Sequence, residues 1–233
     1  MDEMERACLL RGDELLFLLS LADSRPAIVP GLPAPTAYPA VWWEQVAVKL
    51  QQSGLVQYTE SGLAPVGPVV PLLAGIKDAD TVCLAYCRDA GCKTQALYLG
   101  GRQGVLLEGT LWPGYRLRNW DAPPGQWLDG NLGLPDRMPG RGPALPEGQL
   151  APDLAGQPLP AFGEAAPRWG ALEQARTILD VYRVGRLEER LVWWHGAAGW
   201  AVLGQTQAGS RLTADCQPVR QALKQQIWKG GPT

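Results

Sequence analysis

The chain has 233 residues, 46% of them hydrophobic and 19% charged, and its formal net charge is -2. This is enough apolar material for a buried core in one large domain or in two smaller ones. The slight negative charge and the lack of basic runs argue against a protein that binds nucleic acid by neutralising its phosphates.

The N-terminal residues 1–5 are mostly acidic, which is unlike the positively charged start of a signal peptide. The apolar stretch at residues 15–22 is too short to span a membrane. We therefore expect a cytoplasmic protein without a membrane-inserted segment.

Five cysteines lie at positions 8, 83, 87, 92 and 216, and an odd number fits a reducing compartment better than a disulfide scaffold. The C-x3-C-x4-C spacing of Cys83, Cys87 and Cys92 differs from the C-x2-C of structural zinc sites, and the single histidine, His195, is distant in sequence. We predict no metal and no cofactor. We interpret Cys83 and Cys87 as small apolar side chains on one face of a strand.

Two helices are predicted before residue 55. Residues 13–22 begin with an acidic pair, which suits a helix N-terminus, and continue with strong helix formers that are apolar nearly all round, so this helix should be central. Five prolines between residues 25 and 39 exclude regular helix there. Residues 41–53 carry apolar side chains at helical spacing, and Gly54 is placed to end the helix.

A short strand at residues 55–58, its return at 61–64 and an apolar helix at 69–76 follow. Helix, connection, helix and small β wing is the order of a winged-helix subdomain, which we assign to residues 8–77. A DNA-reading winged helix presents Arg, Lys, Asn or Gln from its second helix. Here that helix offers Lys49 and three glutamines beside Glu44 and two tryptophans, so DNA binding is only the alternative function.

Six runs rich in β-branched, aliphatic and aromatic residues predict strands: residues 81–87, 94–99 and 104–112, then 178–183, 187–194 and 199–206. Tight turns that contain glycine separate the runs within each set of three, as in antiparallel meanders. Two such meanders can join into one central antiparallel sheet of about six strands. The alternative is two unrelated small sheets. The predicted fold class is α+β.

The middle run of the second meander has no polar face. Leu191 and Trp193 alternate with Val192 and Trp194, and strand side chains point to opposite faces in turn. A strand that is apolar on both sides needs a cover on each, and a partner chain can supply one of them.

Residues 119–167 contain ten prolines and show no periodicity, so we predict a long irregular connection. It separates an N-terminal half, residues 1–118, from a C-terminal half, residues 168–233, which ends in a helix capped by Asp215. Trp120 and Trp127 lie in the first part of this connection. They either dock a partner or anchor the connection to the sheet.

No residue constellation typical of catalysis is present. His195 lies in a glycine-bracketed turn, and the glycines at 100–104 join two strands instead of opening a phosphate-binding helix. Asp78 and Asp80 fit a capping or turn role. We therefore predict that the protein is not an enzyme.

The order of elements carries a family resemblance. The chain has an N-terminal helix with the pattern Leu10-x-x-Asp13-Glu14-Leu15-x-x-Leu18, a Gly54-Leu55 step, a β-meander, a loop, a second meander whose last turn ends at Gly199, and a C-terminal helix. In this arrangement it resembles the EspG-type chaperones of type VII (ESX) secretion systems. Gly199 is followed by Trp200 where that family tends to have arginine.

The resemblance implies a quasi-two-fold α+β fold with a central antiparallel sheet and flanking helical subdomains. It also implies a cytosolic, non-enzymatic protein that binds helical secretion substrates. On the sheet we select Trp193, Trp194 and Trp200 as anchors for a partner helix, with Trp120 and Trp127 as further candidates. The alternative is that at least two of the three sheet tryptophans belong to the core.

Overall fold

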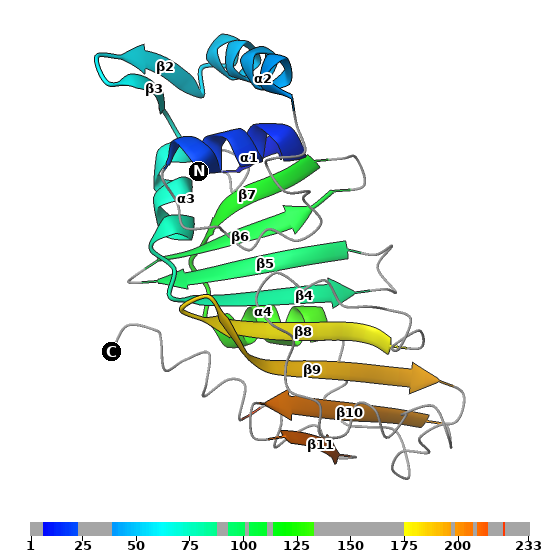
Figure 1. The fold of residues 1–233 in the computed structure, drawn as a ribbon. Coiled ribbons are helices and arrows are strands. Elements are labelled where there is room, and N and C mark those ends of the chain that lie inside the picture. The colour runs from blue at the N-terminus through cyan, green and yellow to red at the C-terminus, as the bar shows by residue number, and fades with distance from the viewer. Residues whose placement is uncertain are drawn as a thin grey trace. The chain divides into compact units, whose positions relative to one another are not determined.

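The computed structural model describes residues 7–22, 39–87, 93–100, 103–110, 114–132, 175–196, 199–206, 209–213 and 221. The chain forms two compact units. Unit 1 consists of Met1–Ala79 and Gln95–Asp121, and unit 2 of Asp80–Thr94 and Ala122–Thr233. Both units combine helices with antiparallel strands, which confirms the predicted α+β class (Figure 1).

Four strands of unit 1 lie in the order β1-β7-β6-β5, and the printed pairs are antiparallel. They are β1 (Cys8–Arg11), β5 (Lys93–Gly100), β6 (Gln103–Gly109) and β7 (Gly114–Trp120). Consecutive residues of β6, Val105, Leu106 and Leu107, are all buried, so this strand is covered on both faces.

Two of these strands, β1 and β7, were not predicted. β1 has only four residues and runs directly into a helix. The strand predicted at residues 104–112 ends at Gly109, and the next strand, β7, begins at Gly114, whose carbonyl accepts a hydrogen bond from the Thr110 amide at 3.0 Å.

Three helices and a hairpin complete unit 1. The helices are α1 (Gly12–Leu21), α2 (Ala40–Gln52) and α3 (Val69–Lys77), and the hairpin pairs β2 (Val56–Thr59) with β3 (Gly62–Pro65). All five elements lie within one residue of their predicted bounds, which confirms the helical spacing and turn signals used to predict them. In Figure 1, α1 lies between β7 and α2, and α3 packs against β6 and β7.

The start of α1 follows the capping rule. The backbone amide of Arg11 donates to Oε2 of Glu14 at 2.8 Å, which satisfies a donor that a helix leaves open at its N-terminus. Leu15, Leu16, Leu18 and Leu19 of α1 are buried, as its nearly all-round apolar character predicts.

Unit 2 contains five strands in the order β4-β8-β9-β10-β11, and the printed pairs are antiparallel. They are β4 (Thr81–Cys87), β8 (Ala175–Arg183), β9 (Arg186–Gly196), β10 (Gly199–Thr206) and β11 (Gly209–Thr213). The second predicted meander corresponds to β8, β9 and β10 and is confirmed. The fourth strand of this meander, β11, was not predicted.

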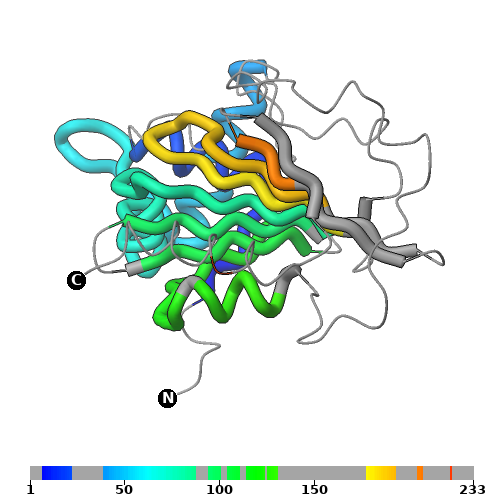
Figure 2. Tube along the Cα trace, turned by 90° about the horizontal axis from the view of Figure 1, so that it is seen from below, coloured from blue at the N-terminus to red at the C-terminus, as the bar shows by residue number. Residues whose placement is uncertain are grey.

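A further helix, α4 (Pro124–Leu132), packs against β4 and lies across one face of that strand (Figures 1 and 2). It falls inside the segment predicted to be irregular. Pro124 is compatible with a helix because proline is tolerated at the first helical position, and Trp127 and Leu128 are buried.

Several predictions concern parts of the chain outside the described residues. These are the rest of the proline-rich connection from residue 133 onward and the C-terminal helix, of which only Gln221 is described. The division into halves at residues 118 and 168 stays a prediction. Within the described part of the chain, no helix is long and apolar enough to cross a membrane.

The turn between β8 and β9 contains an unfavourable residue. Val184 and Gly185 form this two-residue turn with φ of 46° and 76°, which is the conformation of a type I′ hairpin turn. A β-branched residue is strained in this left-handed region, whereas asparagine adopts it readily. Val184 is 70% exposed, so little packing opposes a replacement.

We therefore expect Val184→Asn to stabilise the protein by about 1 kcal/mol. The Val184 amide donates to the Asp80 carbonyl at 2.8 Å, and a replaced side chain leaves this bond in place. Chemical denaturation of the parent and the variant measures the change. Val184→Ala is the control, because it removes the exposed apolar branch without adding a left-handed preference. An equal gain in both variants would contradict the explanation by backbone strain.

Candidate protein-binding site

Helix α2 has one buried face and one exposed apolar face. Its inner face packs towards α1, where the rings of Trp43 and Phe17 lie 5.6 Å apart between centroids. Val41 and Val48 on the same helix are 63% and 53% exposed. They are seven residues apart and therefore share a side of the helix.

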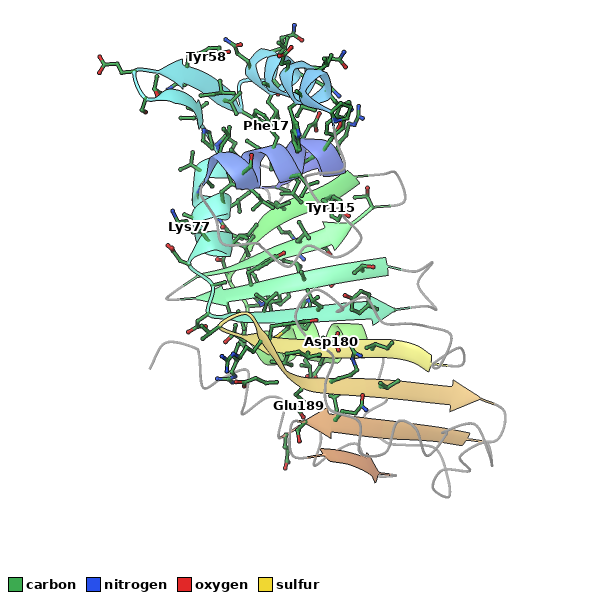
Figure 3. The ribbon with its side chains drawn as sticks, viewed as in Figure 1. Phe17, Tyr58, Lys77, Tyr115, Asp180 and Glu189 are labelled. Carbon is green, nitrogen blue, oxygen red and sulfur yellow. The ribbon has the colours of Figure 1, made fainter. Side chains whose placement is uncertain are left out.

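The hairpin that follows α2 adds another exposed apolar group. Tyr58 on β2 is 73% exposed, and β2 packs against α2 (Figure 3). The exposed neighbours Gln45, Gln52 and Gln57 are uncharged, whereas the exposed Glu44 lies between Val41 and Val48 on the same side of the helix. We name Val41, Val48 and Tyr58 the α2 surface. Its chemistry suits apolar contact with hydrogen bonds around it.

Sequence reasoning did not select the α2 surface, because it concentrated on tryptophans and on the inner stripe of the helix. A signal was present in the second, outward spacing of Val41, Gln45, Val48 and Gln52, which repeats at helical intervals.

The single lysine of α2 forms an ion pair within unit 1. Lys49 Nζ lies 3.1 Å from Oε1 of Glu14 on α1. This ion pair links the two helices and leaves α2 without an unpaired cation for a phosphate. The observation weighs against the DNA-binding alternative.

Trp120 lies at the end of β7 in a small polar group. The guanidinium carbon of Arg118 is 5.3 Å from the centroid of the Trp120 ring, a cation–π distance. Arg118 also donates from Nε to Oε2 of Glu108 at 3.3 Å. The Trp120 side chain is half-buried, and its Nε1 is inaccessible and has no hydrogen-bond partner. One face of the Trp120 ring is therefore already covered by Arg118.

Trp127 on α4 is only 2% exposed. This burial agrees with the interpretation that Trp127 anchors the connection, since a partner could not reach the ring in this conformation.

The three sheet tryptophans lie on neighbouring strands. Trp193 and Trp194 of β9 pair with Val202 and Ala201 of β10, and Trp200 pairs with His195. By strand alternation, positions 193 and 200 belong to one face of the ladder and position 194 to the other. The side chains of these tryptophans lie outside the described part of the structure.

A buried ion pair lies between β8 and β9. Arg190 donates from Nε to Oδ1 of Asp180 at 2.6 Å and from Nη2 to Oδ2 at 2.7 Å, and the Asp180 side chain is fully buried. Burial raises the pKa of Asp180, and the hydrogen bonds from Arg190 oppose this shift. Burial also raises the pKa of Tyr86 and of Tyr182 on the strands beside the pair. Asp180 and Arg190 satisfy each other, whereas the buried hydroxyl of Tyr182 has no hydrogen-bond partner. The raised pKa values of the two tyrosines disfavour their phenolate forms.

The thiol of Cys83 is also unsuited to nucleophilic chemistry. Cys83 is fully buried, and burial raises its pKa to about 12, so the reactive thiolate is disfavoured. Cys8 and Cys83 are free thiols. Within the described ranges, no group of three or more His, Cys, Asp or Glu side chains is placed to hold a metal ion.

Glu189 on β9 is a buried carboxyl with an unsatisfied oxygen. Its side chain is largely buried, and Oε2 has no hydrogen-bond partner. Burial raises the pKa of Glu189, the positive charge of Arg183 opposes the shift, and the negative charge of Glu188 adds to it. A carboxyl whose folded pKa is raised destabilises the fold once pH rises above its ordinary pKa.

We expect Glu189→Gln to raise the unfolding free energy at pH 7 by about 1 kcal/mol, because the buried charge is removed. The gain should disappear below pH of about 4, where the carboxyl is protonated in the folded and unfolded states alike. Thermal unfolding between about pH 3 and pH 8 measures the gain on both sides of this transition. Glu188→Gln is the matched control, since its exposed carboxylate pairs with Arg183 at 3.1 Å. A pH-independent effect of Glu189→Gln would contradict the assignment.

Comparisons with known proteins identify a protein of similar fold. No family model matches the chain, and no curated protein matches its sequence. The fold is similar to that of the Mycobacterium tuberculosis type VII secretion system chaperone EspG5, solved in complex with a PE25–PPE41 dimer. The likeness covers 97% of each chain, with a TM-score of 0.52 and 14% sequence identity. The structural resemblance predicted from the order of elements is thus confirmed at the level of the fold.

Proposed function

We propose that this chain is a non-enzymatic protein-binding module: a cytoplasmic chaperone or adaptor for helical substrates of a type VII secretion system. The observation that carries the proposal is the likeness to EspG5 along nearly the full length of both chains. That protein was solved in complex with a PE25–PPE41 dimer, and we propose a partner of this class for the present chain.

The surface chemistry supports a binding role. The α2 surface, with two exposed valines and a tyrosine, is the second candidate surface and is tested below against the sheet of unit 2. Asp180 and Arg190, which are buried in unit 2, form a bidentate ion pair instead of an acid and base with separate roles.

The finer architecture belongs to the same proposal. We propose that α1, α2 and the β2–β3 hairpin form a winged-helix-like subdomain, since two helices followed by a two-stranded wing have that order. We also propose the quasi-two-fold relationship that the EspG resemblance implies.

The substrate is proposed to bind the sheet of unit 2 through Trp193 and Trp200. Their positions share a face of the β9–β10 ladder. Tryptophans are frequent anchors of protein interfaces, and an amphipathic helix can lay its apolar side along such a face. Trp194, on the opposite face, is a matched control of the same residue type.

The test measures affinity and stability separately. We expect Trp193→Ala or Trp200→Ala to weaken capture of a co-expressed helical-hairpin type VII substrate about 30-fold or more, equivalent to about 2 kcal/mol. Trp194→Ala should bind like the parent. Unfolding midpoints of all three variants show whether a loss of binding reflects a loss of fold. If all three unfold early, or all three bind like the parent, the sheet surface is wrong.

A second variant separates the two surfaces. Val41→Ser combined with Val48→Ser changes only exposed side chains and should leave binding intact. Loss of binding in this variant, with full binding in the tryptophan variants, would assign the partner to the α2 surface and contradict the proposed site. Tight, strongly salt-dependent binding to duplex DNA would instead support the winged-helix regulator.

A further inference from the structure

The β8–β9 ladder contains two shifts of register. Close to the turn, Arg183 pairs with Arg186, and the ladder begins in the register that a two-residue turn dictates. The register shifts between Val181 and Tyr182 and shifts again between Ala175 and Thr177. Residues 177–181 of β8 are therefore paired one residue further along β9 than the turn alone would place them.

The displaced stretch contains the buried ion pair of Asp180 and Arg190, which are directly opposed partners. In the register set by the turn, Asp180 would instead lie opposite Glu189, which is also buried. Two carboxylates would then be neighbours in a site closed to water, and Arg190 would lose its bidentate acceptor. Buried charges without a partner are strongly unfavourable.

Apolar packing does not choose between the two registers. Leu191 and Val192 are consecutive and both buried, so β9 is apolar on either face. A move by one residue exchanges the faces and puts one aliphatic side chain where the other was. A bulge, however, leaves backbone groups out of the ladder. The displacement thus needs a compensating interaction, and the two short hydrogen bonds from Arg190 to Asp180 provide it.

We propose that the Asp180–Arg190 pair sets the register of β8 against β9 and holds both shifts in place. The pair acts as a conformational lock, because it decides which residues of β9 lie on each face of the sheet. This inference is independent of the proposed substrate and concerns how the strand is presented to any partner.

The double variant Asp180→Leu with Arg190→Leu tests the lock, since it removes both charges and keeps apolar volume. Contacts between backbone protons of opposite strands, measured by NMR, report the register directly. We expect the native contact between residues 178 and 192 to be replaced by one between residues 178 and 191, the register set by the turn. A folded double variant that keeps the native contact would overturn the proposal.

Two further variants complete the design. Arg183→Gln with Glu188→Gln removes the more exposed ion pair beside the first shift and should keep the native register. A register change in this control would show that the shift depends on any nearby charge and would also overturn the proposal. If the double leucine variant does not fold, Asp180→Arg with Arg190→Asp restores a pair in reversed order. We expect the native contact in that variant, and a displaced register there would contradict the lock.

Discussion

Burial of strands on both faces is the constraint on which this fold depends. In β6 at Val105–Leu107, and in β9 at Leu191 and Val192, consecutive residues that point to opposite sides are both buried, so this part of each strand is covered on both faces. Such strands are stable only between two layers of cover. In unit 1, α1 and α3 both pack on strands of the sheet, and in unit 2 α4 packs on β4. Strands that are apolar on both faces therefore require helices to cover them. The helices form for this reason as well as through their own helical propensities.

The same constraint explains why polar groups inside the sheet have such definite geometry. In a strand with alternating polar and apolar residues, the hydrophobic pattern sets the register, because a slip by one residue exposes the apolar side. A strand that is apolar on both faces lacks this information. The Asp180–Arg190 pair, with bonds of 2.6 and 2.7 Å, restores it through charge. In this sheet a buried ion pair contributes specificity, which is a better-supported role for such pairs than net stability.

Much of the fold could be predicted from the sequence where one physical signal was strong. The helical spacing of Trp43, Val46 and Leu50 and the glycine turns of the second meander were sufficient to place α2, β8, β9 and β10. β7 was missed because Arg116 and Arg118 interrupt its apolar pattern, and α4 because Pro123 and Pro124 signal a break although proline also starts helices. Weak local signals of this kind are decided by tertiary packing, which a single sequence does not contain.

The candidate site was less accessible to sequence reasoning. The number of tryptophans drew attention to aromatic anchors, but composition does not distinguish Trp127, which is only 2% exposed, from a residue at the surface. Val41 and Val48 are ordinary helix residues by sequence, and only the packing of the opposite side of α2 towards α1 shows that they are exposed. Whether a residue is exposed depends on which face of its helix or strand packs against the other elements.

The likeness to EspG5 at 14% identity illustrates what such a fold retains. Two-sided apolar strands and helices that cover them can be built from many sequences, because packing tolerates hydrophobic exchange when volume and pattern are kept. Residues that recognise a partner have no such freedom, since specificity depends on particular anchors and on groups that reject the wrong partner. Covered positions such as Leu106 and Leu191 can therefore diverge within a common fold. We propose that the positions of Trp193 and Trp200 on the β9–β10 ladder are where a difference in sequence becomes a difference in partner.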